Sequence, residues 1–385
     1  MKHHNSVFQQ LLRAIPRHQF QKMVDRHNGD HRVRKLPCWT QLVAMMFVQL
    51  ASRVSIRDLV ENFNTSHNHH YHLGVSHIKR SSLSDANNSR PVSIFAETFF
   101  FLLQKVRDRL PRGAASDMVR LIDSTTIDLN LNQFEWAHFR KTKGGIKLHT
   151  VYDPEADTPT FFELTTAKVN DCKAAQNLPI MPGVTYVFDR AYDDYSWYYE
   201  MTNQGTWFVG RMKSSAVYEV IEARETTEDF ILEDQIIRLS SDKGRKACPT
   251  DLRRVRIRRE EDGKVLTFIS NDLSRTAAEI AALYKSRWQI ELFFKWIKQN
   301  LKIKRFIGRS ENAVKIQVLT AMIAYLLLRL VQLNYPGRLS LQQIARKINL
   351  NLMTKRSVVD LLSNTPGKSI APTLIAQGFL ELQNV

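Results

Sequence analysis

The sequence predicts an α/β protein in which a central core is interrupted by a β-rich insertion and flanked by helical segments. Three observations lead to this prediction. Apolar residues recur at helical spacing from Phe8 to about Leu110, short β-rich runs follow between Met118 and Lys213, and a long helical stretch begins after Thr276. This order is typical of a mixed α/β core with additions at both ends and in the middle.

The first segment, residues 1–112, is expected to be helical. Within it, Gln41–Leu50 and Ser55–Phe63 are apolar-periodic segments on either side of a short break, and Ser55 with Asp58 matches a helix-opening capping pattern. The pair resembles a helix-turn-helix, although any two helices joined by a short loop give the same pattern. The stretch between Asn62 and Pro91 is rich in His, Asn and Ser and is expected to form a loop.

The first part of the core, residues 113–213, is expected to contain five strands, with a helix between the fourth and the fifth. The runs are VRLIDSTTIDL, IKLHTVYD, TPTFFELTT, VTYVFDRAY and TWFVGRMK. The Gly144-Gly145 pair before the second run is interpreted as a hairpin turn.

Residues 214–275 are expected to form the β-rich insertion. Strand candidates are EDFILEDQIIRL and LRRVRIRREEDGKVLTFIS, and Asp262-Gly263 is a hairpin signal. Alternation would place Arg254, Arg256 and Arg258 on one face of a strand. Such a row could follow a nucleic-acid backbone, or it could be a solvated edge that is protected against aggregation.

Residues 276–335 would complete the core, with one helix to about Asn300 and a buried helix from Val314 to Leu333. In the latter, Lys315 and Arg329 confine the uncharged part to 316–328, which is too short to cross a bilayer. Residues 336–385 are expected to be a C-terminal helical region.

The charge of the chain indicates a polyanionic partner. Lys and Arg number 55 against 38 for Asp and Glu, and the formal charge is +17, so nucleic acid is the leading candidate. The three cysteines, Cys38, Cys172 and Cys248, are far apart and odd in number, which fits neither a disulfide framework nor a zinc ribbon. Together with a start that lacks a signal-peptide pattern, they favour a cytoplasmic protein.

The segment YKSRWQIELFFKWIK carries the most informative pattern. On a continuous helix Tyr284, Arg287, Glu291 and Lys298 fall on one face as a polar stripe beside an apolar face. Alone, the stripe is explained as a solvated face with one Arg-Glu pair.

Two aspartates strengthen the functional interpretation. Asp123 follows the apolar run VRLI, and Asp189 ends the run TYVF, positions at which strands deliver side chains to the edge of a sheet. Asp128, Asp193 and Asp194 are rivals. Three carboxylates from separate elements suit two divalent metal ions in phosphoryl transfer.

These segments, LIDSTTI, YVFDRAYDDY and the helix from 284 to 298, occur in the order found in the DDE transposases of bacterial insertion sequences. The sequence resembles the insertion sequence 4 family of these enzymes, with its Tyr-Arg-Glu-Lys signature. The resemblance spans most of the chain and extends to RSSLSDANNSRP near the N-terminus.

The resemblance implies an RNase H-like, retroviral integrase-like core in which Asp123, Asp189 and Glu291 hold two Mg²⁺ or Mn²⁺ ions. It implies cut-and-paste transposition: nicking of double-stranded DNA at the terminal inverted repeats, attack by the freed 3′-hydroxyl, a hairpin intermediate as in related enzymes, and transfer into target DNA by a homodimer. The N-terminal segment would be a DNA-binding domain.

The resemblance also implies roles in DNA contact. Tyr284, Arg287 and Lys298 would hold phosphates. Trp288 could receive a base that is turned out of the stack, or pack in the core. Two alternatives remain open, which are an RNase H-like nuclease without strand transfer and a DNA-binding regulator without catalysis.

Overall fold

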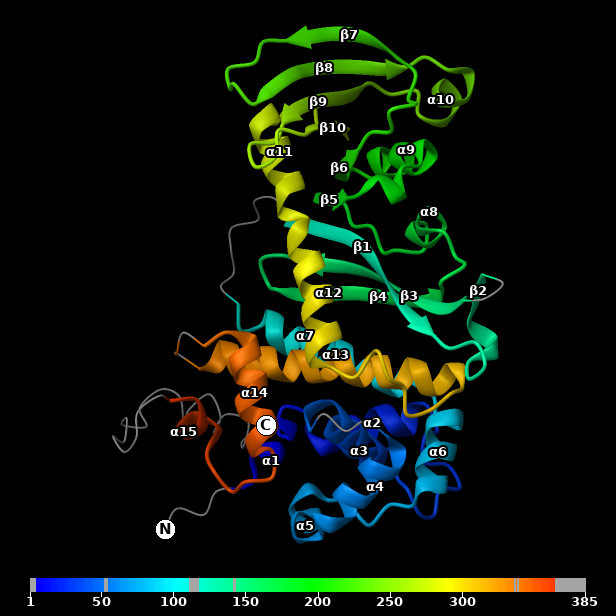
Figure 1. Cartoon of the computed structure of the whole chain (residues 1–385), viewed down its shortest axis with the longest axis vertical. Helices are drawn as coiled ribbons and strands as arrows, with labels where there is room; N and C mark the ends of the chain where they lie inside the picture. The colour runs from blue at the N-terminus through cyan, green and yellow to red at the C-terminus, as the bar shows by residue number, and fades with distance from the viewer. Residues whose placement is uncertain are drawn as a thin grey trace. The chain divides into compact units, whose positions relative to one another are not determined.

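The computed structural model describes residues 5–51, 55–110, 118–140, 143–335, 337 and 339–363. The chain forms two compact units. The helical unit comprises residues 1–111 and 295–385, and the sheet unit comprises residues 112–294. Figure 1 shows helices throughout the first and a long curved sheet in the second.

The N-terminal part of the helical unit is α-helical, as predicted. Its helices are α1 (Val7–Leu12), α2 (Arg17–Arg26), α3 (Cys38–Leu50), α4 (Ile56–Thr65), α5 (His70–Leu73), α6 (Arg80–Ser89) and α7 (Val92–Arg107). The Ser55 hydroxyl accepts a hydrogen bond from the Asp58 backbone N–H, as the capping pattern indicates. The loop expected between Asn62 and Pro91 is wrong, because α5 and α6 lie within it. In α6 the buried residues are Leu83, Ala86 and Asn87, a pattern that polar composition concealed.

The C-terminal part of the helical unit is built around α13 (Glu311–Asn334), followed by α14 (Leu341–Asn351) and α15 (Val358–Leu362). Helix α13 packs against α3, α6 and α7. By length and hydropathy alone it could cross a membrane, contrary to the sequence estimate, but 89% of its most apolar window is buried within the protein. It is therefore a core helix, as predicted. The last part of the expected C-terminal region, 364–385, lies outside the described residues.

The sheet unit contains one ten-stranded sheet in the order β2-β3-β1-β5-β6-β10-β9-β8-β7, with β4 paired to β3. The strands are β1 (Met118–Leu129), β2 (His138–Arg140), β3 (Lys143–Asp153), β4 (Thr158–Thr166), β5 (Val184–Phe188), β6 (Trp207–Arg211), β7 (Tyr218–Arg224), β8 (Ile231–Leu239), β9 (Leu252–Arg258) and β10 (Val265–Ser270). Strands β1, β5 and β6 are parallel, whereas β3 pairs antiparallel with β1, and β4 pairs antiparallel with β3. All five runs expected in the first part of the core are strands.

The hairpin turn expected at Gly144-Gly145 is wrong. Both glycines lie within β3, opposite Leu129 and Asp128 of β1. A Cβ atom on Gly144 would lie 3.0 Å from the Leu129 carbonyl oxygen and 2.8 Å from the Leu131 side chain. These glycines therefore permit close backbone approach within the sheet.

The β-rich insertion continues the core sheet. Strand β10 pairs with β6, and β9, β8 and β7 follow outward (Figure 1). Gly263, with φ +68°, forms the turn between β9 and β10 that Asp262-Gly263 predicts. The insertion thus extends the sheet that carries the first part of the core.

Short helices connect the strands, and two longer ones follow the insertion. They are α8 (Asp171–Ala175), α9 (Tyr195–Asn203), α10 (Asp242–Ala247), α11 (Ala277–Ser286) and α12 (Trp288–Asn300), with a 3₁₀ turn, η3 (Arg190–Tyr192), after β5. The single helix expected from 276 to 300 is divided at Arg287. The predicted segment 276–335 therefore belongs partly to each unit, with the division at Lys295.

Candidate active site

Two of the predicted carboxylates follow paired positions on neighbouring parallel strands. Ile122 of β1 is in register with Phe188 of β5, the last residue of that strand. The next residues along the two strands are Asp123 and Asp189. Because the strands are parallel, both residues lie at the same edge of the sheet, where β5 has ended and β1 continues.

Each aspartate is held by a local hydrogen bond. One carboxylate oxygen of Asp123 accepts from the Ser124 backbone N–H at 2.8 Å. Asp189 caps the 3₁₀ turn η3, and its Oδ1 accepts from the Ala191 N–H at 2.7 Å. The backbone therefore orients both side chains.

Helix α12 provides the third carboxylate, and Arg287 connects it to the first. The guanidinium group lies 2.5 Å from Glu291 Oε1 and 3.3 Å from Asp123 Oδ2. The side chains of Asp123 and Arg287 are each 17% exposed, whereas Glu291 is 53% exposed. The break between α11 and α12 occurs at Arg287 itself, so this residue ends one helix and joins two acidic groups.

Tyr284 packs against both Phe268 and Arg287. Its ring is 4.5 Å from the Phe268 ring, and the guanidinium carbon lies 5.6 Å from its centroid. Burial raises the pKa of the Tyr284 hydroxyl, against the influence of Arg287 and Arg211. The hydroxyl therefore remains protonated and can donate a hydrogen bond.

Burial raises the pKa of Asp123 to about 7, and the nearby charges of Asp189 and Glu291 add to this effect. The Ser124 N–H and Arg287 act in the opposite direction. Ionisation of the Asp123 carboxyl group is therefore costly without a nearby cation, and two further carboxylates add to the negative charge. A divalent metal ion would reduce this electrostatic cost.

Among the described residues, no group of three or more His, Cys, Asp or Glu side chains already has the spacing of a metal site. Arg287 provides a physical reason, since it holds oxygens of Asp123 and Glu291. The donor set nevertheless fits Mg²⁺ or Mn²⁺, because all three side chains offer carboxylate oxygens. Two metal ions would require the Arg287 contacts to open.

The three rival aspartates have other positions. Asp128 is exposed on β1. Asp193 is buried and forms an ion pair with Lys213 at 3.2 Å. Asp194 caps α9 by accepting from the backbone N–H groups of Ser196 and Trp197. None of these contacts involves Asp123 or Glu291.

Two other predicted DNA contacts lie on α12. Trp288 is 57% exposed, so the alternative of core packing is wrong. Ile290 and Phe293 of the same helix are buried. Lys298 lies seven residues beyond Glu291, about two helical turns along the same helix.

Arg254, Arg256 and Arg258 alternate along β9 as predicted, but they do not form an exposed row. Arg254 is 7% exposed and pairs with Glu233, which Arg256 also contacts, and only Arg258 is exposed. The alternative of an edge strand is also wrong, because β9 lies between β8 and β10. Alternation was predicted correctly, but the acidic partner on β8 could not be identified before the strands were paired.

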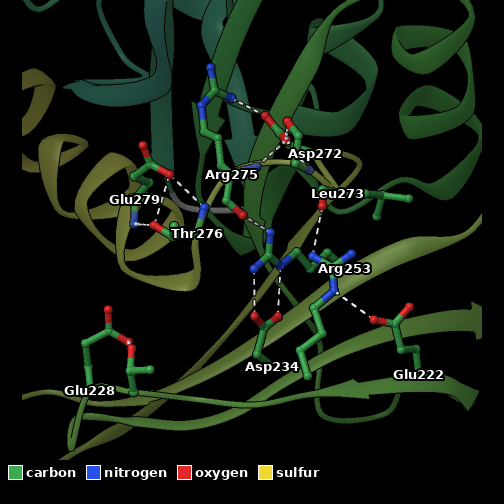
Figure 2. Close-up of polar contacts among 12 residues, drawn as sticks. Glu222, Glu228, Asp234, Arg253, Asp272, Leu273, Arg275, Thr276 and Glu279 are labelled. Carbon is green, nitrogen blue, oxygen red and sulfur yellow. Dashed lines mark hydrogen bonds and ion pairs between the residues drawn. The ribbon is translucent and has the colours of Figure 1, made fainter.

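The neighbouring Arg253 is nearly inaccessible and fixes the loop before α11. Its guanidinium group contacts both oxygens of Asp234 at 2.8 and 2.6 Å and also donates to the Arg275 carbonyl (Figure 2). Arg275 in turn pairs with Asp272, and Thr276 opens α11 through a capping box with Glu279. The insertion is thereby bonded to the start of the helix pair.

A polar group next to Asp123 was only partly predictable from the sequence, in which His149 could either approach the active site or be a hydrogen-bonded structural residue. Ser124, Lys147 and His149 surround the carboxylate of Asp171. Burial lowers the pKa of His149 to about 4, so its ring is neutral. The signal was a lysine and a histidine alternating in the strand run IKLHTVYD, but their acidic partner lies in a separate helix.

Comparison with known proteins shows similarity to transposases. Residues 114–327 match the family model described as "Transposase DDE domain", and residues 3–76 match a domain of unknown function. The transposase homologue y4zB of Sinorhizobium fredii is 44% identical over 64% of this chain and 70% of its own. The protein assigned as transposase of insertion sequence element IS5377 of Geobacillus stearothermophilus is 30% identical over 66% and 68%.

Among solved structures, a piggyBac transposase synaptic complex with hairpin DNA aligns with 97% of this chain and 84% of its own. The TM-score is 0.40 and the identity 9%.

Proposed function

Because this chain belongs to the family of DDE transposases of insertion sequences, we propose that it moves its own element by a cut-and-paste reaction. It would cleave DNA at the terminal inverted repeats and join the freed ends to a target. The observation that carries the proposal is that Arg287 contacts both Asp123 and Glu291, while the charge of Asp189 contributes to the raised pKa of Asp123.

The proposed core is RNase H-like. Support comes from the strand order, in which antiparallel β4 and β3 precede parallel β1, β5 and β6. The proposed acidic residues lie on β1, directly after the adjacent parallel strand β5, and on the later helix α12.

Asp123, Asp189 and Glu291 would hold two Mg²⁺ or Mn²⁺ ions. Bound there, the ions would activate the attacking oxygen and stabilise the leaving oxygen. In the first reaction a water attacks phosphorus at the element end, and the 3′-oxygen leaves and takes up a proton. In the second, that 3′-hydroxyl loses its proton and attacks another phosphorus, and a new 3′-oxygen leaves. Attack on the opposite strand would form a hairpin intermediate.

Residues beside the carboxylates would hold the DNA. Arg287, once released from Asp123 and Glu291, presents a forked set of donors to a phosphate, and Tyr284 adds a hydroxyl. Lys298 would contact the backbone further along α12. Trp288, exposed on the same helix, would stack on a displaced base. Of the three arginines predicted on β9, Arg258 alone is exposed as a phosphate contact requires, since Arg254 and Arg256 pair with Glu233.

The partners would be double-stranded terminal repeats, target DNA and a second protomer. The net charge of +17 supports a polyanion as ligand. The proposed place of action is the bacterial cytoplasm, at the nucleoid.

The test is strand cleavage of a duplex carrying the DNA that flanks the reading frame, with Mg²⁺, by the wild type and by Glu291→Gln. We expect cuts at the element ends that depend on metal and fall at least a thousandfold in the variant, while DNA binding is retained, because a metal-binding oxygen is lost and the fold is not. Asp128→Asn serves as the matched control.

Each outcome distinguishes the proposal from its alternatives. A hairpin band would identify the route of second-strand cleavage. Cuts without any joined product would favour a nuclease of the same fold that does not transfer strands. Binding without cleavage by the wild type would favour a DNA-binding regulator.

A further inference from the structure

Asp171, the first residue of α8, has a side chain that contacts strands β1 and β3. Asp171 Oδ1 accepts a hydrogen bond from the Ser124 hydroxyl at 2.6 Å, and Oδ2 lies 2.9 Å from Lys147 Nζ. His149 Nδ1 lies 3.4 Å from Oδ1. The side chains of Asp171 and Lys147 are 15% and 16% exposed, and His149 is fully buried.

These partners share one face of the β1-β3 pair. Ser124 is in register with His149, and Thr126 is in register with Lys147. A half-buried carboxylate is costly unless it is paired and hydrogen-bonded. Asn170, not Asp171, caps α8. The position of Asp171 is therefore explained by its contacts with the strands and not by helix capping.

Ser124 connects Asp171 to Asp123, the residue that precedes it in the chain. Ser124, whose hydroxyl donates to Asp171, uses its backbone N–H to donate to Asp123 at 2.8 Å. A displacement of Ser124 would move the donor that orients the Asp123 carboxylate.

The same helix also reaches the second aspartate. The Cys172 thiol donates to the Ala191 carbonyl at 3.0 Å, and the Ala191 N–H donates to Asp189. Helix α8 and the 3₁₀ turn η3 are in contact. Thus α8 is bonded on one side to the residue after Asp123 and on the other to the turn that orients Asp189.

We propose that Asp171 is a positioning residue that sets the separation of the Asp123 and Asp189 carboxylates through Ser124 and the contact of α8 with η3. The proposal rests on the proposed function of the two aspartates. Two metal ions roughly 4 Å apart tolerate little variation in the spacing of their ligands. Loss of Asp171 therefore weakens metal binding before it affects DNA binding.

The experiment compares Asp171→Asn and Ser124→Ala with the wild type and with Asp128→Asn, an exposed carboxylate on the same strand. Mn²⁺ binding to each protein alone is measured by calorimetry, and the Mg²⁺ dependence of end cleavage and the affinity for end DNA are measured separately. We expect Mn²⁺ affinity to fall about tenfold in Asp171→Asn and less in Ser124→Ala. Half-maximal cleavage should shift to higher Mg²⁺ by a similar factor, with DNA affinity unchanged.

Unchanged Mn²⁺ affinity in both variants would overturn the proposal, whatever the melting temperature does. A loss of DNA affinity with intact Mn²⁺ binding would overturn it too, because it would identify a DNA contact. Ser124→Ala keeps the ion pair between Asp171 and Lys147 but removes the hydrogen bond between Ser124 and Asp171. It therefore tests the connection to Asp123 even if Asp171→Asn fails to fold. Failure of the proposed function would differ from both, since the wild type itself would then not cleave.

Discussion

At the scale of single residues, the raised pKa of Asp123 makes the metal-free protein sensitive to pH. The carboxyl titrates near 3.8 in an unfolded chain and near 7 in the folded protein. Between these values the folded state binds more protons than the unfolded state, so stability falls as pH rises, and the full penalty is present above pH 7. The shift corresponds to at most about 4 kcal/mol, and we expect about half of that after local relaxation.

Asp123→Asn should therefore stabilise the metal-free protein at pH 8 by about 2 kcal/mol and raise its melting temperature by several degrees. Near pH 4 the variant and the wild type should melt together. The measurement is thermal unfolding in the presence of a chelator across this range. A variant that melts below the wild type at pH 8 would contradict the assigned burial cost. Added Mg²⁺ should stabilise only the wild type.

The sequence predicted the three carboxylates and the pair of Arg287 with Glu291, but not the contacts of Asp123. Asp123, Asp189 and Glu291 could be predicted because strand ends and a spaced signature are local patterns. The pairing of Arg287 with Asp123 joins residues 164 positions apart and depends on the break in the helix. Likewise, Asp171 gives no local sign that it contacts Ser124 and Lys147, since the strand register decides which side chains meet.

At the scale of elements, the buried pair of Arg253 and Asp234 joins strands β8 and β9 to the start of α11. Their side chains are 2% and 6% exposed. The Arg253 guanidinium also donates to the carbonyl of Arg275, the residue before the cap Thr276 (Figure 2). Removing one partner leaves an unpaired buried charge, whereas removing both can be nearly neutral.

Asp234→Asn should lower the free energy of unfolding of the sheet unit by about 3 kcal/mol. The double variant Asp234→Leu with Arg253→Met should recover most of this loss, although the carbonyl of Arg275 loses its donor. Denaturant unfolding of the two single variants and the double variant measures the coupling. Additive losses would contradict a coupled pair. Arg238→Met, which removes an exposed partner of Asp251, is the matched control and should change stability little.

Elements with a strong apolar period were predictable, and those with polar composition were not. The five core strands and α13 follow from alternation and from a continuous apolar run. Helix α6 was missed because Ser and Asn dominate it and only Leu83, Ala86 and Asn87 are buried. The insertion strands were predicted, but their union with β6 is a long-range pairing that no local pattern specifies.

At the scale of the whole molecule, charge governs association. Each protomer carries +17, so two protomers repel each other at low salt. Duplex DNA neutralises this charge and releases its own counterions, so pairing of protomers becomes favourable when both hold DNA. If transposition requires two element ends in one complex, association should depend on end DNA.

We therefore expect the protein alone at low ionic strength to have the mass of one protomer, about 45 kDa from a chain of 44.7 kDa. With duplexes that carry the terminal repeat, light scattering should find two protomers with two duplexes. A scrambled duplex of equal length should give complexes without this stoichiometry, because backbone contacts alone do not align two ends. A one-to-one complex that still joins ends to a target would contradict the need for a dimer and place both reactions within one protomer.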